Sequence, residues 1–383
     1  MHKIYTYSMK SKSKKYTRRQ SKNKKHGGMA IGSGGYGCVF RPALACKNKT
    51  RKKNMVSKLL RDKHAKKEMS TIRKLKKIVK QIPNYQKYFL ITNAGTCKPE
   101  KLSKGDLKQF EYNCTALEKH DHINDKNINK NLDKLIVLNL PDGGVSLSTY
   151  YEYMNEEENF NYINYELINL LKHAIIPMND LHFYHGDIKD TNILYDTNSE
   201  HVSLIDWGLS FSYVKGSLPD IVKRRPFQYN LPFTLILFNN TFDKMYNTTF
   251  TSTKFNETNV KSFVKKYINA WNKERGTGHI DAMEDIWGHF TKSNITNTII
   301  VPYISDVILS FGDEKSFHTQ EYFEKVYVKI VDIWGFLLSY DFILEYNSFN
   351  KREDMCNIYK TYLLDNPCRA INITDLIQKM HNV

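Results

Sequence analysis

The chain has 383 residues, of which 41% are apolar and 25% charged, and it contains 25 Tyr and 20 Phe. This length and aromatic content allow a substantial core and exclude wholesale disorder, collagen and coiled coil. No apolar run reaches the roughly 18 residues of a membrane helix, and the first residues lack the apolar stretch of a signal peptide. We therefore expect a soluble, intracellular protein with no membrane span.

The net charge of +17 is concentrated at the N-terminus. Residues 1–80 hold 26 Lys and Arg but only two acidic residues, Asp62 and Glu68, so the rest of the chain is net acidic. Residues 1–28 contain ten Lys and Arg and no acid, and their mutual repulsion prevents a packed core. We expect a disordered basic tail, either a solvated extension or an arm that contacts a polyanion such as nucleic acid or anionic lipid.

The cysteines are scattered and include no C-x-x-C pair, which predicts reduced thiols rather than a zinc site or a disulfide framework. The six are Cys38, Cys46, Cys97, Cys114, Cys356 and Cys368.

The first ordered elements are predicted to be short strands at 29–44 and 54–60, separated by a basic loop. A helix is expected from Asp62, as its N-cap, to about Lys80, because apolar residues recur there at steps of three or four. These apolar residues are Ala65, Met69, Ile72, Leu75 and Val79. A polar, Asn- and Lys-rich excursion follows at 95–131, and another strand at 132–141.

A second helical pattern covers 162–183, with an irregularity expected at Pro177. Two short strand patterns follow at 192–196 and 202–207, and the remainder consists mostly of helical patterns and loops. Strand-rich sequence therefore precedes helix-rich sequence, which predicts an α+β arrangement of two lobes with a cleft between them.

The first chemical signal is the glycine-rich segment 32–37, GSGGYG, followed by Val39. Glycines let a strand–turn–strand lie against phosphates, because no Cβ blocks the approach of backbone N–H groups. Similar glycine patterns mark dinucleotide-binding folds, in which they open a helix and an acidic residue follows about 20 residues later. Here strand-like sequence continues through Val39 and no acid precedes Asp62, which favours the strand–loop–strand interpretation.

Lys58 lies among apolar residues in the strand at 54–60, which suggests an inward-facing ammonium. A buried ammonium needs a carboxylate partner, and Glu68 on the following helix is the best one available. Alternatively, Lys58 is one more surface lysine and Glu68 pairs with lysines one turn away on its own helix.

The strongest signal is His185-Gly186-Asp187-Ile188-Lys189-Asp190-Thr191-Asn192, followed by Leu204-Ile205-Asp206-Trp207-Gly208. Asp187, Asn192 and Asp206 offer hard oxygen atoms on two neighbouring loops. Such ligands suit Mg²⁺, which binds a few carboxylates together with phosphate oxygens and water.

Taken in order, GSGGYGCV, VSK, HGDIKDTN and DWG resemble the Gly-rich loop, the lysine strand, the catalytic loop and the D-F-G motif of the protein kinase family. The segment Asp332-Ile333-Trp334-Gly335 resembles the start of the central helix of the large kinase lobe. Asp285-Ile286-Trp287-Gly288 is a similar sequence, but we prefer Asp332 because the apolar stretch around it is better suited to a buried helix. The resemblance covers about 29–383 and is greatest to the kinase-like proteins of giant DNA viruses. A location in host cytoplasm or virion would follow from such an origin.

The resemblance implies a two-lobed kinase-like fold. Its small antiparallel β lobe with one helix, at 29–140, would bind ATP, and its larger, mainly helical catalytic lobe would span 141–383. The region at about 239–325 would be an insertion larger than the family pattern leads us to expect.

The resemblance also assigns roles to individual residues, with ATP and Mg²⁺ as cofactors. Asp187 would orient the substrate hydroxyl, Lys189 would stabilise the transferring phosphoryl group, and Asn192 and Asp206 would hold Mg²⁺. The remaining ATP-binding residues would be Ile31, Gly32, Ser33, Gly34, Gly35, Tyr36, Gly37, Val39, Lys58 and Glu68.

Two departures from the family pattern affect regulation and substrate docking. Gly186 replaces the usual arginine of the catalytic loop, which implies activity without a phosphorylation switch unless Arg224 or Arg225 binds a phosphate. The A-P-E motif is absent, and residues 225–233 are expected to take its place in substrate docking.

Three functions are compatible with these motifs. The preferred one is a protein serine/threonine kinase acting on a protein substrate, because Lys189 resembles the Ser/Thr branch of the family. H-G-D and I-D-W-G are also reminiscent of small-molecule phosphotransferases of aminoglycoside-kinase type. The third possibility is a catalytically silent kinase fold that serves as a binding module.

Overall fold

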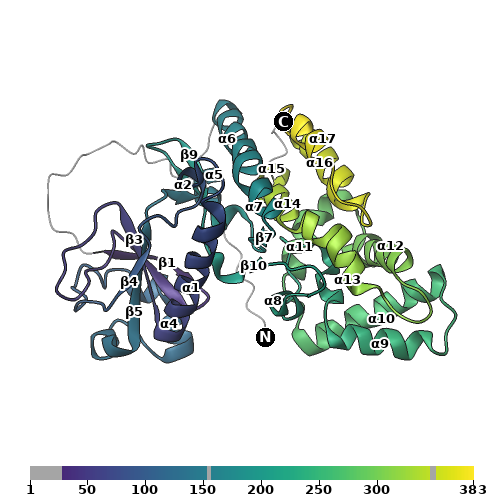
Figure 1. Ribbon diagram of the computed structural model, residues 1–383, viewed down its shortest axis with the longest axis horizontal. Coiled ribbons are helices and arrows are strands. Elements are labelled where there is room, and N and C mark those ends of the chain that lie inside the picture. The colour runs from purple at the N-terminus through teal and green to yellow at the C-terminus, as the bar shows by residue number, and fades with distance from the viewer. Residues whose placement is uncertain (1–27, 153–156, 346–350) are drawn as a thin grey trace.

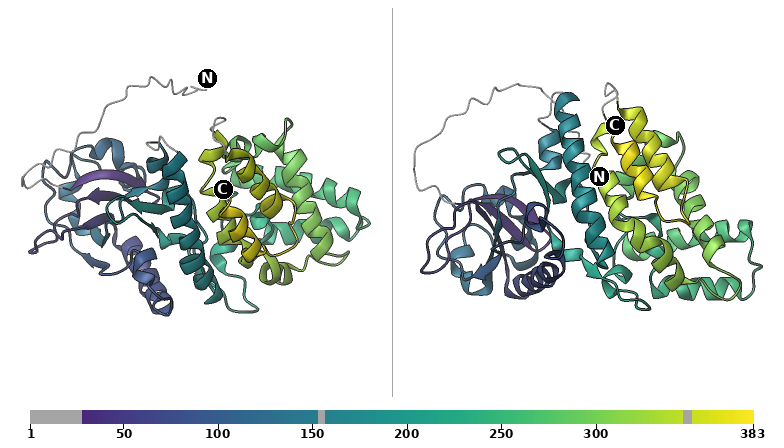
Figure 2. Two further views of the ribbon diagram at one scale, coloured as in Figure 1. Left: turned by 90° about the horizontal axis from the view of Figure 1, so that it is seen from above. Right: turned by 45° about the horizontal axis from the view of Figure 1, so that its top comes forward.

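The computed structural model describes residues 28–152, 157–345 and 351–383 (Figure 1). The predicted basic tail lies outside these residues apart from Gly28, whose N–H donates to Asp106 Oδ1 at 2.6 Å. The fold is mixed α+β, as predicted, with a small antiparallel sheet and a larger helical part. Helix α6 stands between the sheet and most of the other helices in both views of Figure 2.

The main sheet has the strand order β1-β2-β3-β5-β4, with every neighbouring pair antiparallel. Its strands are β1 (Met29–Gly34), β2 (Gly37–Arg41), β3 (Met55–Arg61), β4 (Gly95–Cys97) and β5 (Leu135–Pro141). Lys58 lies opposite Val39 on β2 and Leu138 on β5. Because side chains alternate along a strand, Lys58 projects from the face opposite to Leu59, which is buried in a small core.

Helix α1 (Asp62–Val79) confirms the predicted helix, but Arg61 rather than Asp62 occupies the N-cap position. Asp62 instead belongs to the first turn and pairs with Lys66 at 2.6 Å, an exposed i,i+4 contact. Its buried residues are Ala65, Ile72, Leu75 and Val79, whereas the predicted core residue Met69 is partly buried. The helix thus packs its apolar stripe inward and leaves most of its lysines exposed.

The polar excursion at 95–131 begins with β4, an edge strand of the sheet, and continues through α3 (Phe110–Asn113) and α4 (Thr115–Asp121). Two disulfides fasten it, Cys38–Cys114 and Cys46–Cys97. The prediction of reduced thiols is therefore wrong for these four cysteines. Their partners are 76 and 51 residues apart, so tertiary folding rather than a local motif brings them together.

The predicted helix at 162–183 is α6 (Glu157–Leu170), a π-turn at Leu171–Ile175 and α7 (Ile176–Asp180). The irregularity precedes Pro177, which has no N–H to donate to a regular helix. Two small sheets follow. One pairs β7 (Phe183–Tyr184) with β10 (Phe211–Ser212), and the other contains β6 (Val145–Ser146), β8 (Ile193–Asp196) and β9 (His201–Leu204).

The rest of the described chain is mostly helical, as predicted. Its helices are α2 (Tyr85–Tyr88), α5 (Leu147–Tyr151), α8 (Asp220–Lys223), α9 (Asn240–Phe250), α10 (Glu257–Arg275), α11 (Ile280–Trp287), α12 (Val301–Phe311), α13 (Thr319–Tyr322), α14 (Val328–Leu338), α15 (Phe342–Glu345), α16 (Arg352–Tyr359) and α17 (Ile373–Met380). The region 239–325 contains α9 to α13, and its longest helix, α10, packs against α12.

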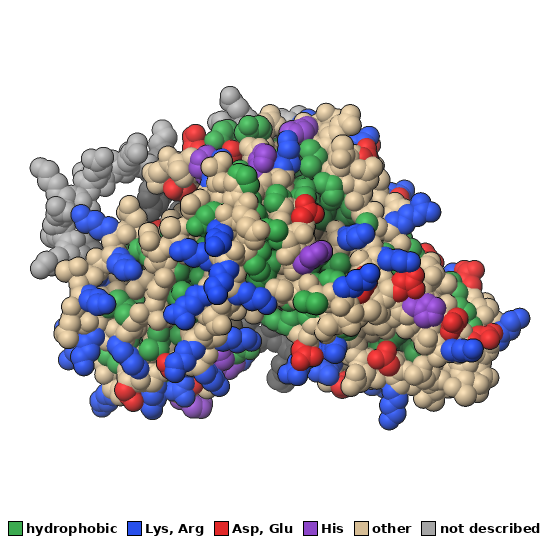
Figure 3. All heavy atoms as spheres, viewed as in Figure 1, with side chains coloured by type: hydrophobic (Ala, Val, Ile, Leu, Met, Phe, Trp, Pro, Cys, Tyr) green, Lys and Arg blue, Asp and Glu red, His purple; other side chains and the backbone are tan. Residues whose placement is uncertain are grey.

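The surface reflects the uneven charge of the sequence. Lys and Arg side chains gather over the sheet part on the face drawn in Figure 3, whereas acidic side chains are more frequent over the helices. None of the helices in the described chain is both long and apolar enough to cross a bilayer.

Candidate active site

The glycine-rich segment forms the β1–β2 hairpin, as its strand–loop–strand pattern predicts. Gly34 pairs with Gly37, and Gly35-Tyr36 form the turn. A Cβ on Gly34 would lie 3.6 Å from Lys58 Cε, so the end of the hairpin lies beside Lys58. A Cβ on Gly37 would approach the Leu59 carbonyl oxygen to 2.4 Å, a separation that excludes any larger residue.

Other residues of the hairpin have different surroundings. No described atom lies within 4 Å of a Cβ built on Gly32 or Gly35, so these glycines leave backbone open to solvent. Ile31 is exposed, and Ser33 Oγ accepts a hydrogen bond from the Ala116 N–H at 2.9 Å. The exposed Tyr36 ring stacks on His64 of α1, with 4.2 Å between ring centroids.

Lys58 lies between two carboxylates from different elements. Its Nζ is 2.9 Å from Glu68 Oε1 on α1 and 3.6 Å from Asp206 Oδ1 after β9. The side chains of Lys58 and Glu68 are only 13% and 12% exposed, which excludes the alternative of a surface lysine with Glu68 paired along its own helix.

The pKa values of this group reflect burial and mutual attraction. Burial lowers the pKa of Lys58, but the carboxylates of Asp206 and Glu68 outweigh it and raise that pKa overall. The Lys58 ammonium holds the pKa of Asp206 below its ordinary value. Burial raises the pKa of Glu68, and Lys58 offsets this only in part. The mutual attraction of Lys58 and Asp206 therefore favours the charged form of each.

Asp206 has an unusual backbone for a residue other than glycine, with φ at +63°. Aspartate tolerates this left-handed region better than most residues, and its side chain accepts a hydrogen bond from the Gly208 N–H at 3.4 Å. The next residue, Trp207, is buried against Phe89, Phe183 and His185. This aromatic anchor fixes the turn that presents the Asp206 carboxylate.

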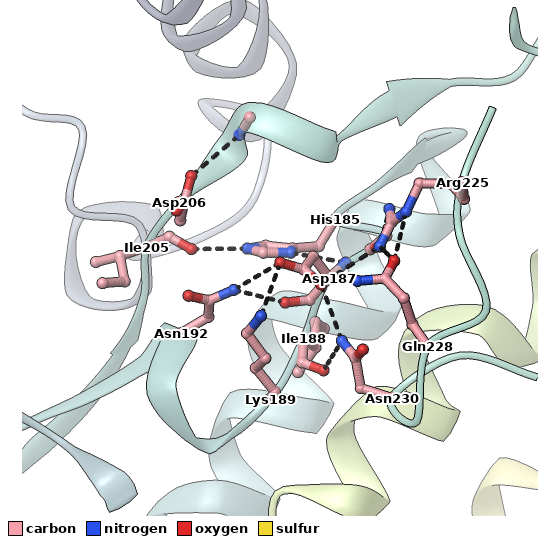
Figure 4. Close-up of polar contacts among 12 residues, drawn as sticks. His185, Asp187, Ile188, Lys189, Asn192, Ile205, Asp206, Arg225, Gln228 and Asn230 are labelled. Carbon is pink, nitrogen blue, oxygen red and sulfur yellow. Dashed lines mark hydrogen bonds and ion pairs between the residues drawn. The ribbon is translucent and has the colours of Figure 1, made fainter. Parts of the chain in front are cut away.

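Asp187 lies in the loop between β7 and β8, and its carboxylate is surrounded by donors (Figure 4). Oδ2 accepts a hydrogen bond from Asn192 Nδ2 at 3.1 Å and lies 3.3 Å from Lys189 Nζ. Oδ1 accepts hydrogen bonds from Asn230 Nδ2 at 3.0 Å and from Arg225 NH2 at 3.3 Å. These contacts hold the carboxylate in one orientation, and two of the donors come from beyond its own loop.

The amide of Asn192 has a defined orientation. Its Nδ2 donates to the Asp187 carbonyl at 2.8 Å as well as to Oδ2, which uses both amide hydrogens. Its side-chain oxygen therefore points away from Asp187, as Figure 4 shows. This oxygen is the atom that a hard cation would need.

The protein residues of the site can supply only some of the ligands of a cation, so phosphate oxygens and water would have to supply the rest. Within the described residues, no group of three His, Cys, Asp or Glu side chains is arranged to hold a metal. An amide oxygen from Asn192 and a carboxylate from Asp206 remain, which suits Mg²⁺ bound chiefly by phosphate oxygens and water.

His185 connects the Asp187 loop to the strand that leads to Asp206. Its Nδ1 accepts from the Asp187 N–H at 3.2 Å, so the ring proton resides on Nε2, which donates to the Ile205 carbonyl at 2.9 Å. The imidazole is thus fully engaged between two backbone segments and positions both carboxylates.

Asp332 on α14 fixes the other end of the Asp187 loop. Its two oxygens accept the N–H groups of His185 and Gly186, both at 2.8 Å. Burial raises the pKa of Asp332, and the positively charged surroundings and these two N–H groups oppose that rise. By contrast, Asp285 is exposed on α11.

Gly335 on α14 has no side chain, which lets the Asp187 loop pack closely against this helix. We expect Gly335→Ala to lower the free energy of unfolding by about 1–3 kcal/mol, the usual cost of overpacking. A Cβ there would meet the Ile188 carbonyl oxygen at 2.4 Å, whereas none of the described atoms lies within 4 Å of a Cβ on Gly288. Gly288→Ala is therefore the matched control and should leave stability nearly unchanged. Urea unfolding of both variants checks this; equal stabilities would contradict the close approach of α14.

Part of the site is not predicted by the sequence. The sequence places Arg225 and Asn230 only in substrate docking or phosphate binding, yet both contact Asp187, and Gln228 accepts from Arg225. Polar residues at this spacing within an otherwise apolar segment were a signal, because buried polar groups require partners.

No protein-family model matches this chain, and no curated protein matches its sequence.

Proposed function

We propose that the protein is a serine/threonine kinase with a kinase-like two-lobed fold, which transfers the γ-phosphoryl group of ATP to a protein hydroxyl with Mg²⁺. The observation that carries this proposal is the position of Lys58 between Glu68 and Asp206, because it joins the lysine strand and the helix after it to the DWG motif, which lies far along the chain. A purely structural ion pair would not require the open glycine hairpin beside the lysine.

The chemistry follows from the charges. The transition state of phosphoryl transfer is loose and anionic, so catalysis depends on positioning and on positive charge. Lys58 would hold the α- and β-phosphates beneath the β1–β2 hairpin. Asn192 and Asp206 would hold Mg²⁺, and the bound ion would offset phosphate charge.

The acceptor hydroxyl would be oriented by Asp187 Oδ2. Lys189 Nζ lies 3.3 Å from that oxygen, close enough for its charge to act on the group being transferred. The hydroxyl proton would pass to the Asp187 carboxylate as the new P–O bond forms and the bond to the ADP leaving oxygen breaks.

The test measures transfer from γ-labelled ATP with Mg²⁺ to a basic carrier protein and, separately, to small hydroxyl and amino compounds. Label on protein serine or threonine, lost in Asp187→Asn, supports the proposal. Label on the small molecules alone would indicate the phosphotransferase alternative. ATP binding without any transfer would indicate a silent binding module.

A further inference from the structure

Arg225 is an arginine buried at the centre of the candidate site, with only 7% of its surface exposed. It lies just after α8, 38 residues beyond Asp187 in sequence. Burial lowers its pKa, and the Asp187 carboxylate is the main opposing influence. A buried guanidinium requires compensation for its lost hydration, so its contacts indicate what it does.

The guanidinium makes contacts on three sides. NH1 donates to the Gly186 carbonyl at 2.5 Å, Nε donates to Gln228 Oε1 at 2.7 Å, and NH2 lies 3.3 Å from Asp187 Oδ1. The planar guanidinium, with donors in fixed directions, thus connects one carbonyl, one amide and one carboxylate. The single ammonium of a lysine cannot reproduce this geometry. Arg225 therefore connects the Asp187 loop to its own segment.

Gly186 is shaped for this contact. Its φ is +68°, and a Cβ at this position would lie 3.1 Å from the Leu209 carbonyl oxygen in a conformation that side chains disfavour. The glycine conformation turns its carbonyl toward Arg225. The chain thus lacks a side chain at 186 and supplies a positive charge from residue 225 instead.

These contacts also argue against phosphate binding by Arg225. Its donors are engaged with protein acceptors and its side chain is only 6% exposed. The neighbouring Arg224 is exposed. Arg225 is therefore a poor candidate for the arginine that the sequence analysis considers as a binder of a regulatory phosphate.

We propose that Arg225 is a positioning residue that holds Asp187 Oδ1 and leaves Oδ2 directed toward Lys189 and the acceptor hydroxyl, so that the site is assembled without phosphorylation of the chain. The inference rests on the proposed kinase function. Asn230, at 3.0 Å from the same oxygen, acts alongside Arg225 from the same segment. Without Arg225, Asn230 is the one described donor left on Oδ1, and the carboxylate can rotate out of this orientation.

The experiment compares Arg225→Met with the matched control Arg224→Met, which removes the same charge from an exposed neighbour. Arg225→Met should lower kcat by about 10²-fold, the usual cost of misplacing a reacting group by about 1 Å. The KM for ATP should change little, because Lys58 and Asp206 are untouched. Arg224→Met should retain wild-type kcat, and phosphatase treatment of the wild type should not change its activity.

Arg225→Lys provides a second variant in case Arg225→Met does not fold, and circular dichroism checks both. The lysine keeps the charge but not the fork, so kcat should lie between those of the wild type and Arg225→Met. Equal kcat values for Arg225→Met and Arg224→Met, or a rise in kcat, would overturn the inference, as would failure of both Arg225 variants to fold. A wild type that transfers no phosphoryl group would instead refute the proposed function itself.

Discussion

Asp187→Asn is expected to lower kcat by about 10²–10⁴-fold, the range attributed to a positioned general base. The amide cannot take up the hydroxyl proton. It also replaces one acceptor by an NH₂ group that would face Arg225 and Asn230 on one side or Lys189 on the other. Four donors suit a carboxylate, with its two oxygens and about four lone-pair sites, but not an amide.

Steady-state kinetics and ATP titration separate these effects. The affinity for ATP should remain within about twofold, because a group that acts in the transition state contributes little to ground-state binding. Asp220→Asn is the charge-matched control, since that side chain is 77% exposed and pairs with Lys223 at 3.6 Å. An Asp187→Asn variant with wild-type kcat would show that Asp187 does not act on the hydroxyl.

The parts of the site that the sequence predicts best are local. The hairpin follows from glycines at fixed offsets, and the direction of Lys58 follows from alternation along β3. Glu68 comes within reach because α1 begins directly after that strand, which makes a separation of ten residues in sequence compatible with 2.9 Å in space. Each inference needs only the geometry of one element or of two consecutive ones.

The parts that the sequence does not predict depend on long-range packing. Arg225 meets Asp187, and Cys38 meets Cys114, because separate segments pack together, and no spacing rule encodes either pair. The sequence selects Asp332 by its resemblance to kinases and by the apolar stretch around it, but it does not predict what the carboxylate contacts. Its burial against two backbone N–H groups, 146 and 147 residues away in sequence, distinguishes it from Asp285.

Asp206→Asn is expected to lower phosphoryl transfer by about 10³-fold, because metal-ion stabilisation of a transition state amounts to several kcal/mol and each 1.36 kcal/mol is tenfold in rate. Asparagine is the suitable replacement, since it also tolerates the left-handed backbone at φ +63°. The variant should therefore fold normally and lose only the charge. The pKa of Lys58 should fall, because Asp206 is the largest influence raising it.

The dependence of ATP binding on Mg²⁺ distinguishes a lost metal ligand from a general defect. For the wild type, Mg²⁺ should strengthen ATP binding, whereas for Asp206→Asn the affinity should be nearly the same with and without the ion. Asp220→Asn should behave as the wild type in the same titration. If Asp206→Asn kept both its activity and its response to Mg²⁺, the carboxylate would serve only to neutralise Lys58, and the ion would have to bind elsewhere.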